Sequence, residues 1–354
     1  MPVESIQLSE ITALGKKNNI PSSVLIEVCY TCNETCVHCC LNNHTKAGLT
    51  LEQYGLLFDQ MVEAGTFYVI LTGGEPFTRS DFMEIVRSAR KHRLSVTIFT
   101  NATLLTEQQI AVLRSLYIDE VHVSIYSADA TIHDRITGVP GSFAKSTAAI
   151  KAMLAAGVTV RIKCPLMKIT ADGVDGIKDL ARHLGVSIQY STVITARNDG
   201  AVGTHEFRLT GDQLKRVLSD PDVIAQGPEP IYFRENLDCI PCDTVFNGGA
   251  IDPEGNVYVC NQLRIIGGNI LKQSFGEIWR DSRVFKRLRE IRLKDLEKCA
   301  DCELFQHCTR CPGLAHLEDG NVLGCSSIAK AVAQALQEVN VYPTEAHIFS
   351  RPIG

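Results

Sequence analysis

Three cysteines near the start of the chain have a spacing that suits an iron–sulfur cluster. Cys32, Cys36 and Cys39 lie in the run Cys-Asn-Glu-Thr-Cys-Val-His-Cys, directly after an apolar stretch at residues 24–28. Three thiolates on one short loop can hold three corners of a cubane [4Fe–4S] cluster, which takes four cysteines when it is fully ligated. The iron without a protein ligand can then bind another molecule, as the open position of a catalytic zinc site does.

The same loop also permits a structural zinc site. Cys29 and Cys40 flank the three cysteines, so the loop divides equally well into the pairs Cys29-x2-Cys32 and Cys36-x2-Cys39. Pairs of this kind are typical of zinc ribbons. The loop alone leaves both alternatives open.

The run Gly73-Gly74-Glu75-Pro76 has the composition of a ligand-binding turn. Glycines let the backbone approach a ligand closely, and a carboxylate such as that of Glu75 can accept hydrogen bonds from an ammonium group. A plain Gly-Gly turn is the alternative. Further polar residues stand near the ends of later apolar runs, namely Thr100, Asn101, Ser124 and Lys163.

A second cysteine-rich region lies between residues 239 and 325. It holds eight of the 14 cysteines, spaced as Cys239-x2-Cys242, Cys260, Cys299-x2-Cys302-x5-Cys308-x2-Cys311 and Cys325. Eight thiolates suffice for two fully ligated [4Fe–4S] clusters, although the run at 299–311 would also suit one zinc ion. In a reducing cytosol, metal binding explains so many cysteines better than disulfides do.

Alternating strands and helices position these residues. Apolar or β-branched runs predict strands over residues 24–28, 67–71, 96–100, 121–125, 158–162 and 186–194. Helical spacing predicts helices over 51–64, 82–92, 107–116, 142–155 and 174–184. Thr106 with Gln109 resembles a capping box, and Gly65 and Gly157 occupy C-terminal cap positions. The alternation implies parallel βαβ units, but it does not separate a partial (β/α)6 barrel from an open doubly wound sheet.

Composition and length bound the rest. The chain has 354 residues, 45% of them hydrophobic and 21% charged, with a formal net charge of −5, so we expect two domains and no nucleic-acid partner. The N-terminus has no signal-peptide pattern, and no apolar run reaches about 18 residues, which predicts a cytoplasmic protein without a membrane span. We divide the chain into a short extension (1–20), a core (21–199), a Gly- and Pro-rich connection with one helix near 210–218 (200–236), the cysteine-rich region (237–330) and a surface tail (331–354).

These motifs resemble the radical S-adenosylmethionine (radical SAM) superfamily, whose defining motif is C-x3-C-x2-C after the first strand of a barrel. The resemblance favours the partial (β/α)6 barrel over an open sheet. It implies that SAM chelates the open iron and is cleaved reductively to a 5′-deoxyadenosyl radical, which abstracts hydrogen from a substrate. A zinc site would not require this arrangement of motifs at successive strand ends. The implied SAM contacts are His38, Thr72, Gly73, Gly74, Glu75, Pro76, Thr100, Asn101, Ser124 and Lys163.

The second cysteine region resembles the SPASM domain of radical SAM enzymes, with one residue fewer between Cys308 and Cys311 than the usual pattern. By this resemblance one auxiliary [4Fe–4S] cluster uses Cys239, Cys242, Cys260 and Cys311. The other uses Cys299, Cys302, Cys308 and Cys325. Residues 251–258 predict a hairpin that presents Cys260. Cys29, Cys40 and Cys164 have no assigned ligand role.

SPASM relatives include maturases of ribosomally made peptides, which implies a radical SAM enzyme that modifies a precursor peptide. Crosslinking, thioether formation, epimerisation and backbone excision all begin with the same hydrogen abstraction, and Cys164 is a candidate hydrogen donor for epimerisation. The alternatives are a radical SAM enzyme for a small molecule such as a haem precursor, and a non-enzymatic metal scaffold, which has no use for the GGEP run.

The implied partners are a precursor peptide and an electron donor such as flavodoxin or ferredoxin. About 20 residues precede the first predicted strand, too few for a leader-binding domain. We therefore expect a separate leader-recognition protein.

Overall fold

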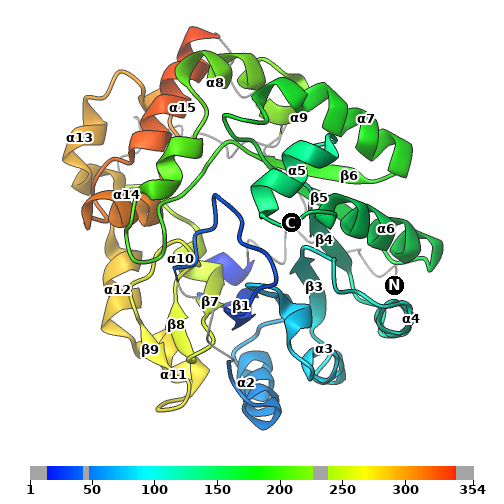
Figure 1. Cartoon of the computed structure of the whole chain (residues 1–354). Coiled ribbons are helices and arrows are strands. Elements are labelled where there is room, and N and C mark those ends of the chain that lie inside the picture. Colours follow the sequence, from blue (N-terminus) through cyan, green and yellow to red (C-terminus); the bar gives the residue numbers. More distant parts are fainter. Residues whose placement is uncertain (1–13, 43–47, 226–237, 340–354) are drawn as a thin grey trace, which may run out of the picture.

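A parallel sheet surrounded by helices forms the first half of the protein (Figure 1). The computed structural model describes residues 14–42, 48–225 and 238–339. Residues 1–13 of the predicted extension, 226–236 of the predicted connection and 340–354 of the predicted tail lie outside the described residues. All six predicted barrel strands are present: β1 (Ser23–Cys29), β2 (Tyr68–Gly73), β3 (Ser95–Thr100), β4 (Glu120–Ser124), β5 (Val160–Pro165) and β6 (Ser187–Ser191).

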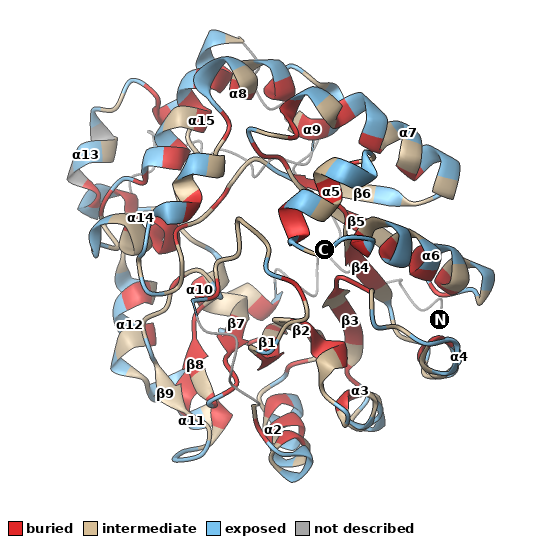
Figure 2. Ribbon diagram, viewed as in Figure 1, coloured by how far each residue is buried: buried red, intermediate tan, exposed pale blue. Residues whose placement is uncertain are grey.

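The helices that follow these strands cover the outer face of the sheet (Figure 2). The predicted helices are α2 (Leu51–Glu63), α3 (Phe82–Lys91), α4 (Glu107–Ser115), α6 (Ser142–Ala155) and α7 (Val174–Leu184). The capping box of Thr106 and Gln109 is confirmed, as are the positive φ angles of Gly65 and Gly157. Helix α5 (Ala130–Thr137) was not predicted. Short 3-10 turns η1 (Pro76–Thr78) and η2 (Ala171–Gly173) follow β2 and β5.

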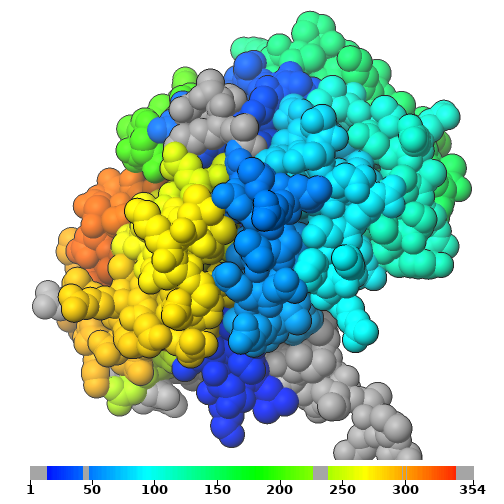
Figure 3. Space-filling view, turned by 90° about the horizontal axis from the view of Figure 1, so that it is seen from below, coloured from blue at the N-terminus to red at the C-terminus, as the bar shows by residue number. Residues whose placement is uncertain are grey.

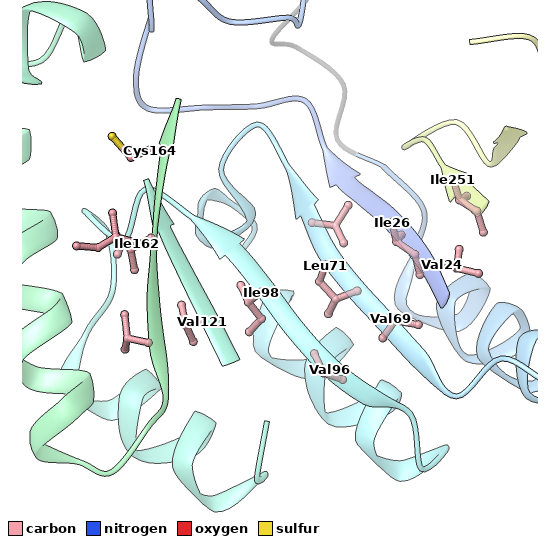
Figure 4. Close-up of a cluster of buried hydrophobic side chains, with 14 of the residues drawn as sticks. Val24, Ile26, Val69, Leu71, Val96, Ile98, Val121, Ile162, Cys164 and Ile251 are labelled. Atoms are coloured by element: carbon pink, nitrogen blue, oxygen red, sulfur yellow. The ribbon is translucent and has the colours of Figure 1, made fainter. Parts of the chain in front are cut away.

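The main core lies between the sheet and these helices (Figure 4). Alternate strand residues such as Val24, Leu71, Ile98 and Ile162 are fully buried there, because successive strand side chains point to opposite faces. The other face of each strand lines the barrel interior, where polar residues such as Thr72, Ser124 and Lys163 border a cavity.

The cysteine-rich region extends the same sheet. Its short strands are β7 (Gly248–Ile251), β8 (Asn256–Tyr258) and β9 (Gly268–Asn269). β7 and β8 form the predicted hairpin, and β7 pairs in parallel with β1. The described strands thus form one sheet of nine, in the order β6-β5-β4-β3-β2-β1-β7-β8-β9.

Helices pack this region against the barrel. The helix predicted near 210–218 is α8 (Gly211–Leu218), which begins at a capping box on Thr210, and α8 contacts α15 (Ser327–Glu338). Figure 3 shows residues around 275, in yellow, against α2 in blue, where the Phe275 amide donates a 2.8 Å hydrogen bond to Gln60. The remaining elements are η3 (Gly203–Phe207), α9 (Pro221–Ile224), α10 (Thr244–Asn247), α11 (Phe275–Asp281), α12 (Arg283–Glu290), η4 (Leu293–Asp295), α13 (Glu297–Ala300), η5 (Phe305–His307) and α14 (Pro312–Asp319).

None of the helices in the described part of the chain has the length and apolar character needed to cross a membrane.

Candidate functional site

A cavity of about 340 Å³ opens at the carboxyl ends of the barrel strands. Loop residues 32–41, the ends of β2 to β5, and Asn261 from the cysteine-rich region all border it. This is the end of a barrel where active sites assemble. The predicted site residues that line it are Cys32, Cys36, His38, Cys39, Thr72, Gly73, Gly74, Thr100, Asn101, Ser124 and Lys163.

The loop that carries the first three cysteines is fixed by the end of α5. The Thr35 amide donates to the Thr137 carbonyl at 2.9 Å, and the Val37 amide donates to the Ile136 carbonyl at 3.0 Å. Cys32, Cys36 and Cys39 lie within electrostatic reach of one another. Burial raises the pKa of Cys32 to about 12 and also raises that of Cys36. These thiols therefore need a bound cation to hold them as thiolates at neutral pH.

Gly73 and Gly74 bring the end of β2 against this loop. A Cβ atom on Gly73 would lie 2.2 Å from the Cys29 carbonyl oxygen, and one on Gly74 would lie 2.3 Å from that of Thr31. The Gly74 amide donates to Cys29, and the Glu75 amide donates to Thr31, each at 2.8 Å. The two glycines therefore serve first to seat the cysteine loop, and their exposed edge borders the cavity.

Glu75 lies behind the cavity wall rather than on it. Its carboxylate accepts hydrogen bonds from the Thr100 hydroxyl and the Asn101 amide at 2.7 Å each, and from the Phe77 amide at 3.1 Å. The side chain is fully buried, and burial raises the pKa of Glu75 to about 7. Glu75 thus joins the end of β2 to the end of β3, and Pro76 is buried beside it in η1.

Lys163 reaches the cavity from β5. Its Nζ atom lies 3.7 Å from the centre of the Phe99 ring, a cation–π contact. Burial lowers the pKa of Lys163 to about 8, with a further contribution from Arg161. At neutral pH the lysine thus offers a positive charge inside the cavity, suited to a carboxylate.

Several residues that border the cavity were not predicted from the sequence. Tyr126 lies two residues after Ser124, on the same face of the chain, and its hydroxyl is 3.7 Å from the Cys36 sulfur. Its ring meets that of His38 edge-on at 4.8 Å. Phe99 precedes Thr100 on β3, and alternation along the strand could have identified it. Asn261 carried no sequence signal, because only the folded sheet brings it to the barrel.

Cys164 points away from the cavity. Lys163 and Pro165 line the cavity, whereas Cys164 is buried in the core beside Ile162 (Figure 4). Its thiol is 3.9 Å from the Tyr126 carbonyl. This position argues against Cys164 as a hydrogen donor. Cys40, another cysteine without an assigned ligand role, does border the cavity.

Four cysteines of the second region line a separate cavity of about 530 Å³. They are the predicted set Cys299, Cys302, Cys308 and Cys325. Three of the other predicted set, Cys242, Cys260 and Cys311, lie within electrostatic reach of one another. Cys311 is therefore grouped in space with Cys242 and Cys260, although it is close in sequence to Cys308.

Cys239 packs against a different apolar cluster from Cys242, Cys260 and Cys311. It packs against Leu293, Leu296 and Phe305, the cluster that Cys299 also contacts, and its carbonyl accepts a 3.0 Å hydrogen bond from the Leu293 amide. Its role as the fourth ligand of the first auxiliary set stays a prediction.

The donor sets suit iron–sulfur clusters. Within residues 14–42, 48–225 and 238–339, no three His, Cys, Asp or Glu side chains converge as ligands of a single metal ion. The first three cysteines and the set of Cys299, Cys302, Cys308 and Cys325 each border a cavity, and a cluster is held by thiolates at its corners. These two sets of thiols therefore have room for a cluster at the cavity that they border.

Comparisons with known proteins agree with this site. The model of the radical SAM superfamily matches residues 26–184, and that of the SPASM iron–sulfur cluster-binding domain matches residues 242–303. The AdoMet-dependent heme synthase of Methanosarcina barkeri is 29% identical over 86% of this chain and 95% of that protein. The mycofactocin maturase MftC of Mycolicibacterium smegmatis is 29% identical over 81% of this chain and 77% of that protein.

A similar fold occurs in Streptococcus suis SuiB, whose crystal structure holds the precursor peptide SuiA. The superposition has a TM-score of 0.65 at 18% identity and covers 90% of this chain and 78% of SuiB. At this identity the likeness supports the fold alone.

Proposed function

Because this chain belongs to the radical SAM superfamily and carries a SPASM iron–sulfur domain, we propose that it modifies a ribosomally made precursor peptide. The likeness to the maturase MftC supports this substrate class. One observation carries the proposal: Asn261, next to Cys260, borders the same cavity as Cys32, Cys36 and Cys39. A substrate in that cavity would lie between the SAM-binding cluster and an auxiliary cluster.

When bound, a [4Fe–4S] cluster and SAM would supply the radical chemistry that removes a hydrogen atom from the substrate. Cys32, Cys36 and Cys39 would hold that cluster, with Gly73 and Gly74 seating their loop. Lys163 would bind the SAM carboxylate, while Thr100, Asn101 and Ser124 would orient SAM from neighbouring strand ends. Phe99, Val193 and Ile194 are apolar residues that also line this cavity.

The two auxiliary sets would take up or relay single electrons during the oxidation of the substrate. A flavodoxin or ferredoxin in the cytoplasm would supply the electron for SAM cleavage. The separate leader-recognition protein stays a prediction.

A haem precursor is the second candidate substrate. The heme synthase of M. barkeri aligns over 95% of its length, so the relationship reaches across both the barrel and the cysteine-rich region. A reaction on a haem precursor would use the same cluster site and the same SAM site of this chain.

Co-expression with short open reading frames beside the gene, followed by tandem mass spectrometry, tests the first proposal. We expect a mass change in one peptide that disappears when Cys32, Cys36 and Cys39 are all replaced by alanine. In parallel, the anaerobic protein is incubated with SAM, a reductant and a haem precursor. Conversion of that precursor, with every neighbouring peptide left unmodified, would refute the peptide proposal in favour of the second.

A further inference from the structure

Arg310 occupies the place where the second cysteine motif departs from the usual SPASM spacing, between Cys308 and Cys311. The side chain is only 8% exposed. Its Nε donates a 3.2 Å hydrogen bond to the Gly324 carbonyl, and its Nη2 donates to the Val322 carbonyl. Nη1 is buried and has no hydrogen-bond partner among the described residues. Two carbonyls thus fix the guanidinium while one donor group stays unused.

The guanidinium lies between the two auxiliary cysteine sets. It is within electrostatic reach of Cys299, Cys308 and Cys325 on one side and of Cys311 on the other. The Arg310 side chain borders the 530 Å³ cavity, and its backbone amide donates to the Cys308 sulfur. The unused Nη1 donor is therefore available to the group that fills this cavity.

We propose that Arg310 raises the reduction potential of the auxiliary cluster held by Cys299, Cys302, Cys308 and Cys325, through its fixed charge and an Nη1 hydrogen bond to cluster sulfur. The inference rests on the ligand sets of the proposed function. Net charge, hydrogen bonds to sulfur and exposure set the potentials of such clusters, and a guanidinium stays protonated in proteins. The step it affects is a one-electron reduction, with the electron supplied by an external reductant and no bond made or broken.

Other charged groups at this cavity are placed differently. Glu318 is paired with Arg208 at 2.8 Å, and Asp319 accepts a hydrogen bond from the Asn321 amide. Lys298 and Lys330 border the cavity but are exposed, so solvent and salt screen their charges. Lys330 thus offers a matched control, with the same charge at the same cavity but without burial.

The test uses the full chain with Cys32, Cys36 and Cys39 replaced by alanine, so that the auxiliary clusters alone give the electron paramagnetic resonance signals. The midpoint potentials are measured by redox titration for this background and for Arg310→Gln, Arg310→Met, Arg310→Lys and Lys330→Gln added to it. We expect either neutral Arg310 variant to lower the equilibrium constant for reducing one auxiliary cluster about tenfold, which is about 59 mV for one electron. Arg310→Lys should restore part of the difference, and Lys330→Gln should leave the potential unchanged.

Iron and sulfide are counted in each variant. An unchanged potential in a neutral variant with full iron content would overturn the proposal. So would loss of auxiliary iron from both neutral variants, because Arg310 would then act in cluster assembly. If only one of them loses iron, the potential of the other decides. Failure of the ligand sets is distinguishable, because the background protein with its original Arg310 would then lack auxiliary clusters.

Discussion

Lys163 carries a positive charge into the cavity at the strand ends, with the like charge of Arg161 two residues before it on β5. Its ammonium group rests on the Phe99 ring, and Ser124 and Gln189 are its partners on the adjacent strands. Burial lowers the pKa of Lys163 to about 8, so the group loses its proton within an accessible pH range. This makes its proposed contact with the SAM carboxylate open to a direct test.

We expect SAM affinity to fall as pH rises through about 8. A bound carboxylate favours the protonated lysine, so the contribution of Lys163 is fully present below its pKa and is lost above it. The loss approaches tenfold per pH unit at high pH. Binding is measured anaerobically on the cluster-loaded protein from about pH 6.5 to about pH 9.5.

Lys163→Met should bind SAM more weakly than the original protein at neutral pH, and the difference should shrink at high pH. SAM itself also titrates in this range, and that effect cancels when the binding curves of the two proteins are subtracted. Lys151→Met, which changes an exposed lysine of α6, should follow the original curve. A constant difference between Lys163→Met and the original protein at every pH would contradict a charged contact.

At the scale of elements, the junction between β2 and the cysteine loop leaves no room for added atoms. A Cβ on Gly74 would also lie 2.6 Å from the Tyr30 carbonyl oxygen, so the loop would have to move. We expect Gly74→Ala to destabilise the fold by roughly 1–3 kcal/mol, as overpacking does. It should also reduce the iron bound in a variant that lacks the auxiliary cysteines.

Gly55→Ala is the matched control, since Gly55 lies within α2 and a Cβ there meets nothing within 4 Å. It should raise the free energy of unfolding slightly, by about 0.5–1 kcal/mol. Equal thermal midpoints and equal iron content in the two variants would show that Gly74 does not seat the loop.

The elements also show what the sequence could and could not predict. The six barrel strands and their helices follow from hydrophobic periodicity, which is local information. Helix α5 was missed because it is short and polar on several sides, and Asp129 alone marks its start. The pairing of β7 with β1 was missed because four residues containing two glycines carry little pattern, and the partner strand is distant in sequence.

The candidate site, too, has parts that the sequence could predict and parts that it could not. Spacing indicated its cluster cysteines, the resemblance to the radical SAM superfamily implied its SAM contacts, and most of these residues meet at one cavity. The directions of single side chains could not be predicted. Cys164 and Lys163 are neighbours on β5, and only the strand register decides which of them enters the cavity. Asn261 and Arg310 owe their positions to contacts between distant segments, which periodicity does not report.

At the scale of the whole molecule, one buried ion pair joins the barrel to the cysteine-rich region. Arg264 contacts both carboxylate oxygens of Glu27, at 2.8 Å and 2.5 Å, and their side chains are 10% and 8% exposed. Tyr30 donates a further hydrogen bond to Glu27 at 3.1 Å. The pair lies beside the β1–β7 junction, between the SAM cavity and the segment that carries Cys260.

Removing one partner should therefore cost more than removing both. Arg264→Met leaves the Glu27 carboxylate buried without its counter-charge, which we expect to destabilise the fold by roughly 3–5 kcal/mol. The double variant Glu27→Gln, Arg264→Met should recover part of that loss, because no unpaired charge remains. Urea unfolding of the anaerobic, cluster-loaded proteins measures the single variants Arg264→Met and Glu27→Gln and the double variant. The exposed pair of Arg182 and Asp179 is the control, and its removal should change the midpoint little.

Strictly additive effects of the two single substitutions would mean that Glu27 and Arg264 stabilise the protein independently, and that the two regions are held together by sheet pairing and apolar packing alone.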